Sequence, residues 1–186
     1  MNNFVKILIS SLMLISVFTI AGCGSGDKFE GKWVTTKSST FTKFDGADYK
    51  QLNIEKNGDS YLLTETNSSY KLKESKIGNK GFLPIFDATF VWETRKPIQS
   101  SAKLDGDNRL VIDGTMSLGT ITYVEKDGTL LIGRDIYTKE KKGDMQQFKE
   151  SEQKRLQELY DTGNMGFYHK ESFNSFKFAD ISVDTK

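Results

Sequence analysis

Short turn motifs divide residues 29–137 into segments in which apolar and polar side chains alternate. Asn57-Gly58, Asp105-Gly106 and Asp127-Gly128 each lie between two such segments. Asn-Gly and Asp-Gly favour type I′ turns, which need a positive φ at both central residues and connect antiparallel strands. The chain is therefore expected to fold mainly as consecutive β-hairpins.

The clearest strand covers residues 85–93, where the alternate residues Phe86, Ala88, Phe90 and Trp92 lie on one face. This period of two indicates one buried face and one face in water. Further strands are expected at 31–36, 49–56, 60–66, 69–74, 100–104, 109–113, 118–125 and 129–138. Sequential hairpins of this number favour an antiparallel up-and-down β-barrel or a two-sheet sandwich. A barrel leaves no unpaired edge strand.

One α-helix is expected at about 144–162, after the strands. Asp144 and Gln147 have the spacing of a capping box, and Gly163 is suited to end the helix. The tail 164–186 is rich in aromatic residues, unlike most disordered segments. It is expected to dock on the barrel, with residues 175–183 as a candidate extra strand. The alternative is that Phe173, Phe176 and Phe178 bind a protein partner.

Charge and composition exclude several classes of function. Of the 26 Lys and Arg residues only Lys6 precedes residue 23, so 25 basic residues face 25 acidic ones in the rest of the chain. This balance argues against nucleic-acid binding and against electrostatic docking on anionic lipid. With one Cys and one His, a zinc or copper site is not expected. Residues 29–186 have a length that suits a single domain.

Residues 1–23 resemble the signal peptide and lipobox of bacterial lipoproteins. Lys6 precedes an apolar stretch, and Ile20-Ala21-Gly22-Cys23 ends it with small residues before the only cysteine. The resemblance implies removal of residues 1–22 and attachment of lipid, palmitate included, to Cys23. Residues 23–28 would then form a lipidated tether. A transmembrane helix would need about 20 apolar residues, more than this stretch provides.

The lipobox resemblance also implies a location. In a cell with two membranes, Gly24 directly after the cysteine implies the outer membrane, with the domain facing the periplasm. In a cell with one membrane, the protein would lie on the outer leaflet of the cell membrane.

Gly31 and Trp33, in the sequence Phe29-Glu30-Gly31-Lys32-Trp33, resemble the Gly-x-Trp motif that begins the first strand of lipocalins. A barrel followed by one helix is also the order of elements in that family. The resemblance implies a cup for a small apolar ligand, with Trp33, Phe86, Phe90 and Trp92 as lining residues. The alternative is that these side chains fill the barrel, because eight-stranded barrels hold either side chains or one ligand.

No catalytic motif is evident in the sequence, and no cofactor or metal is expected. Asp105-Gly106-Asp107-Asn108 lacks the ligand pattern of a calcium loop because Arg109 follows it. Residues 78–81 are rich in glycine and are expected to form a flexible loop. The sequence thus favours a non-enzymatic, lipid-anchored envelope protein that binds a small hydrophobic ligand or presents a binding surface. The alternative is a protein-interaction role, as an assembly factor, inhibitor or immunity-type lipoprotein.

Overall fold

The structure is a computed structural model that describes residues 28–37, 44, 46–114, 119–166 and 168–179. The expected signal peptide and Cys23 lie outside the described residues, as do residues 180–183 of the expected tail strand. In the part of the chain that is described, no helix is long and apolar enough to cross a bilayer.

The described residues form strands, one α-helix and a short 3₁₀ helix. In chain order the elements are β1 (Gly31–Lys37), β2 (Asp48–Asn57), β3 (Ser60–Lys80), β4 (Leu83–Thr94), β5 (Ile98–Leu104), β6 (Arg109–Ile112), β7 (Thr120–Val124), β8 (Thr129–Ile132), β9 (Asp135–Lys139), α2 (Asp144–Asp161), η1 (Lys170–Ser172) and β10 (Phe173–Ala179).

Eight antiparallel strands close into a β-barrel, which confirms the expected fold class. The strands follow one another in the order β3-β2-β1-β9-β8-β7-β6-β5, and pairing between β5 and the first part of β3 closes the ring. The pairing of β1 with β9 joins the two ends of the hairpin series, with Trp33 opposite Lys139. Closure therefore leaves these eight strands without a free edge along the barrel.

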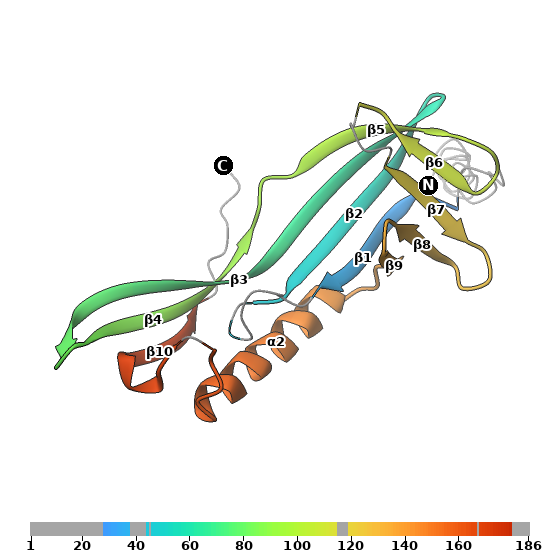
Figure 1. The fold of residues 1–186 in the computed structure, drawn as a ribbon. Helices are drawn as coiled ribbons and strands as arrows, with labels where there is room; N and C mark the ends of the chain where they lie inside the picture. Colours follow the sequence, from blue (N-terminus) through green and yellow to red (C-terminus); the bar gives the residue numbers. More distant parts are fainter. Residues whose placement is uncertain (1–27, 38–43, 45, 115–118, 167, 180–186) are drawn as a thin grey trace, which may run out of the picture.

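Strand β3 is long enough to pair both within the barrel and in a hairpin that leaves it. Its 21 residues pair first with β5, from Ser60 to Glu65, and then with β4, from Ser68 to Lys80. The expected strands 60–66 and 69–74 are thus one continuous strand. Figure 1 shows β3 and β4 leaving the barrel together as a long hairpin, with β10 and α2 beside it. Conversely, the expected strand 129–138 is two strands, β8 and β9, because Gly133 has a positive φ of 62° in the turn between them.

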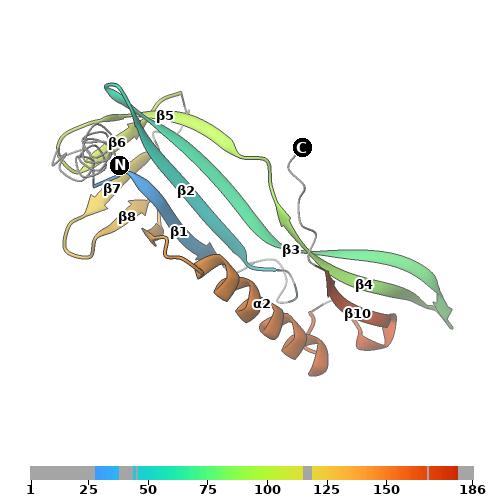
Figure 2. The same cartoon turned by 180° about the vertical axis from the view of Figure 1, so that it is seen from behind.

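Two separate hydrophobic cores result from this layout. The barrel core contains buried side chains from β1, β2, β3 and β5–β9, with Phe29 and Trp33 completely buried. The second core lies between α2 and one face of β3, β4 and β10, and it includes Phe90, Trp92 and Leu156. Seen from behind in Figure 2, α2 runs along the outside of β1 and continues beneath the sheet of β3, β4 and β10.

The tail docks on the domain, as the sequence predicted. Strand β10 adds to the edge of β4 in parallel, with Phe176 opposite Ala88 and Phe178 opposite Phe90. Parallel pairing needs a long connection. Here β5–β9 and α2 lie between β4 and β10 in the chain, and β10 begins beside Phe86, near the start of β4. The expected strand at 175–183 begins two residues too late, because β10 starts at Phe173.

Several local predictions are wrong. None of the described non-glycine residues has a positive φ, so the three expected turns are not type I′. Gly58-Asp59 is the two-residue loop between β2 and β3, with a φ of 62° at Gly58, as type II′ turns require. Residues 78–80 belong to β3, so the expected flexible loop is the end of a strand.

The N-terminus of the helix also differs from the expected capping box. Gly143 is the N-cap, with a φ of 97°, and no side chain caps the helix. The Asp144 carboxylate instead accepts a hydrogen bond from the Lys141 amide at 2.7 Å. At the other end, Gly163 and Asn164 donate to the Tyr160 and Leu159 carbonyls, as in a Schellman motif. The predicted end at Gly163 is confirmed.

Candidate functional site

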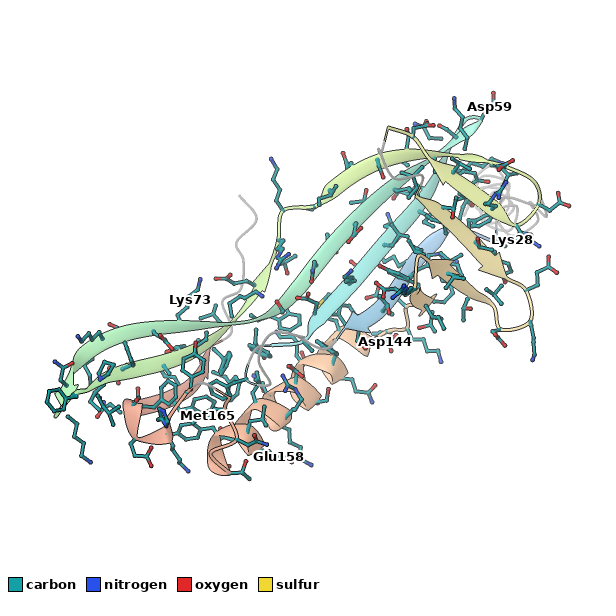
Figure 3. All side chains as sticks on the ribbon, viewed as in Figure 1. Lys28, Asp59, Lys73, Asp144, Glu158 and Met165 are labelled. Carbon is teal, nitrogen blue, oxygen red and sulfur yellow. The ribbon has the colours of Figure 1, made fainter. Side chains whose placement is uncertain are left out.

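A groove lies between the outer face of the barrel and the first half of α2. It has a volume of about 370 Å³ and a largely apolar lining, made up of Val34, Thr36, Tyr49, Asp144, Gln147, Phe148 and Ser151. The first three come from β1 and β2, and the other four from successive turns of the helix. Figure 3 shows Asp144 where the helix begins, beside β1.

The sequence covers both faces of the barrel wall here, because β1 carries adjacent apolar residues and β2 places Tyr49 on the outer face near its start. Trp33 and Val34 are neighbours, yet both are buried, Trp33 in the barrel and Val34 against the helix. Tyr49 is also buried on the outer face, and its ring centroid lies 5.3 Å from that of Phe148. Helix and barrel therefore meet through side chains of unequal size, which leaves space between them.

Polar groups at the side of the groove are already ordered by hydrogen bonds. The Tyr49 hydroxyl donates to Glu140 at 3.1 Å, and Gln51 donates to the other oxygen of the same carboxylate at 2.6 Å. Burial raises the pKa of Tyr49, and the negative charges of Glu140 and Asp144 raise it further. The Tyr49 hydroxyl is therefore a neutral donor that Glu140 already engages.

The lining of the groove is apolar apart from a few polar side chains. The Ser151 hydroxyl donates to the Phe148 carbonyl at 2.8 Å, so it is engaged with the helix backbone. Within the described residues, no group of three or more His, Cys, Asp or Glu side chains could hold a metal ion. An apolar surface with a few polar groups is typical of sites for small apolar ligands.

The interior of the barrel is packed with side chains around Trp33. The indole N–H donates to the Phe29 carbonyl at 2.7 Å, and the Lys139 ammonium lies 4.1 Å from the centre of the Trp33 ring. Phe29 contacts Tyr61 and Tyr123 edge to face, with ring centroids about 6 Å apart. Burial lowers the pKa of Lys139, although the Glu30 carboxylate opposes this effect.

A polar layer lies beyond this apolar layer. Lys50 and Asp135 form an ion pair at 3.6 Å, and both are largely shielded from solvent. Tyr137 is buried next to them, and its pKa is raised by burial and then by the charges of Glu65 and Asp135. The described inward side chains of the barrel are therefore aromatic, aliphatic and paired polar groups.

The four predicted lining residues do not share one cup. Trp33 belongs to the barrel core, whereas Phe90 and Trp92 are buried in the second core and Phe86 packs against it. The period of two in β4 correctly placed the last three on one face. It could not show that this face meets α2, because β4 leaves the barrel.

The three predicted partner-binding residues lie on the second core. Phe173 is buried, and Phe176 and Phe178 are partly buried against it. Phe176 stacks on Tyr160 with ring centroids 4.2 Å apart, and Phe178 stacks on Phe90 at 5.6 Å. These side chains join β10 to the helix and the sheet.

The sequence did not predict the groove residues as a site. The available signal was the pair Trp33-Val34, because adjacent apolar residues in a strand indicate that both faces are covered. In comparisons with known proteins, no family model, no curated protein and no solved structure matches this chain.

Proposed function

We propose that this protein is a lipid-anchored, non-enzymatic component of a bacterial cell envelope that binds a small apolar molecule in the groove between α2 and the barrel. The groove carries the proposal, because its volume of about 370 Å³ falls in the usual range of ligand sites, roughly 300–1,000 Å³. The packed barrel core favours this site over a cup inside the barrel.

The lipid anchor rests on the lipobox resemblance at Cys23. An eight-stranded barrel followed by one helix is the order that the lipocalin resemblance implies, and membership of that family stays a proposal. In the protein-interaction alternative, the loops and the aromatic tail carry the function. Because β10 is paired along β4, a partner would meet this segment as the edge of a sheet.

Filling the groove tests the binding proposal. Ser151 is exposed and lines the groove, so Ser151→Phe places an aromatic ring in it while the helix is kept. Lys154→Phe is the matched control, because Lys154 is exposed on the same helix and does not line the groove. The probe is N-phenylnaphthylamine, an apolar dye that fluoresces when it leaves water.

The dye is expected to bind the wild type and the Lys154→Phe variant, and Ser151→Phe should weaken binding at least tenfold. Equal binding by both variants would place the dye elsewhere and contradict the proposal. The anchor is tested separately by Cys23→Ser, which should move the protein from the membrane fraction to the soluble fraction of the cell envelope. Continued membrane association would contradict lipidation as the anchor.

A further inference from the structure

The β3–β4 hairpin ends in a tip, defined here as residues 75–86, that projects away from the rest of the domain (Figure 1). Lys80 pairs with Leu83, so Gly81 and Phe82 form a two-residue turn between the strands. Gly81 has a φ of 64°, which L-residues with side chains rarely adopt. The tip is thus a defined hairpin turn in which Phe82 is held at the extreme end.

The tip exposes large apolar side chains. Phe82 is fully exposed, and Ile77 and Leu83 are 50% and 43% exposed. Every residue from Lys73 to Leu83 is exposed, so none of these apolar groups has cover from the domain. Clustered apolar side chains on a projecting element indicate a surface that becomes buried in a complex or a membrane.

The charge of the tip favours a membrane over a protein complex as the surface that buries it. Lys76 and Lys80 are its only charged residues, and it contains no Asp or Glu. Lys73, just outside the tip, is already paired with Glu93 at 2.8 Å. Apolar side chains next to positive charges that form no ion pair with another described residue match the surface of an anionic bilayer, where lysines meet headgroups and the apolar groups enter the interface.

We propose that the tip of the β3–β4 hairpin is a second membrane-contact site, in which Phe82, Ile77 and Leu83 enter the interface of an anionic lipid bilayer while Lys76 and Lys80 contact its headgroups. The near-zero net charge of the domain matters less here than the charges within about one Debye length of the tip. Glu74 and Asp87 flank the tip directly, so residues 73–87 hold Lys73, Lys76 and Lys80 against these two carboxylates, a net charge of +1.

The position of the tip predicts how the molecule would be oriented on the membrane. Lys28, the first described residue, lies at the barrel end of the molecule, far from the hairpin tip, with Lys73 on the hairpin itself (Figure 3). An anchor just before Lys28 and a contact at the tip would hold both ends of the molecule. The long axis would then lie along the membrane surface.

Vesicle binding tests the proposal with residues 24–186, a chain that lacks the anchor and contains every described strand and helix. Sedimentation is measured with vesicles of phosphatidylcholine alone and of equal parts phosphatidylcholine and phosphatidylglycerol. The wild type should bind the anionic vesicles. Phe82→Ala should reduce partitioning about tenfold or more, from the usual value of burying such a side chain. Loss of each lysine should reduce it about fivefold.

Ile136→Ala is the matched control, because Ile136 is 61% exposed on β9 in the barrel and away from the tip. It should bind as the wild type does. In Phe82→Trp, the new fluorophore should shift to shorter wavelength on anionic vesicles. Failure to bind either vesicle, equal binding to both, or an unshifted Phe82→Trp spectrum would overturn the proposal. Capture of an envelope protein by the tip without vesicle binding would also overturn it, in favour of a protein partner.

Discussion

Glu152 interrupts the apolar stripe of α2 and is nevertheless buried, which makes it a sensitive test of how the helix is held. Only 4% of the residue is exposed, and one carboxylate oxygen accepts the Ala47 N–H at 2.7 Å. Arg155 donates to both oxygens, at 2.5 and 2.9 Å. The glutamate thus connects the helix to the segment before β2.

Glu152→Ala should lower the free energy of unfolding by about 1–4 kcal/mol. The larger part is the buried Ala47 N–H left without an acceptor, which costs about 1–3 kcal/mol. The ion pair adds less, about 0–1 kcal/mol, because the Arg155 side chain is 38% exposed. Glu152→Gln keeps an oxygen within reach of Ala47 and should therefore cost distinctly less than Glu152→Ala.

The measurement is urea unfolding of residues 24–186 followed by circular dichroism, with Arg155→Ala as the comparison. Arg155→Ala should cost less than Glu152→Ala, since it keeps the hydrogen bond from the Ala47 amide to Glu152. Hydrogen exchange at the Ala47 amide should accelerate in Glu152→Ala and stay slow in Arg155→Ala. A cost below about 0.5 kcal/mol for Glu152→Ala, or equal costs for the Ala and Gln variants, would refute the assignment of the energy to this hydrogen bond.

Three further predictions concern the second core and the barrel. Gly46→Ala should destabilise the fold by about 1–3 kcal/mol in urea unfolding, because its Cβ would lie 2.3 Å from the Tyr70 carbonyl oxygen; Gly78→Ala, with nothing within 4 Å, should be neutral. Deleting residues 173–186 should lower the melting temperature markedly, since it removes β10 from the second core; an unchanged melting temperature would show that the tail is dispensable. Stability should fall above about pH 10, where unfolded tyrosines ionise while the raised pKa of Tyr137 keeps it neutral in the folded state. Tyr137→Phe should weaken that fall, and an identical pH profile would contradict it.

Most strand positions could be predicted from the sequence because alternation and turn residues are local signals. The alternation in β4 identified the buried face through Phe86, Phe90 and Trp92. It could not identify what covers that face, because the cover comes from α2, whose residues lie more than fifty positions later. The sequence therefore could not show that Trp33 lies in a different core from the aromatic residues of β4.

The remaining errors have local physical causes. The strand does not break near residue 67 as expected. The polar residues there lie where β3 changes its pairing partner from β5 to β4. The capping box failed because Gly143 adopts a positive φ, which lets Asp144 bond backward to Lys141. The groove could not be predicted at all, since it depends on the spacing of two elements that pack without pairing.

The shared strand β3 has a consequence for how the molecule loses its structure. Its first residues close the barrel and its later residues form the floor of the second core. Separation of the two cores would require one continuous strand to be ordered on one side and unfolded on the other. We therefore expect the barrel and the second core to unfold in a single cooperative transition. A destabilising substitution in the hairpin should then also lower the stability of the barrel, at the opposite end of the molecule.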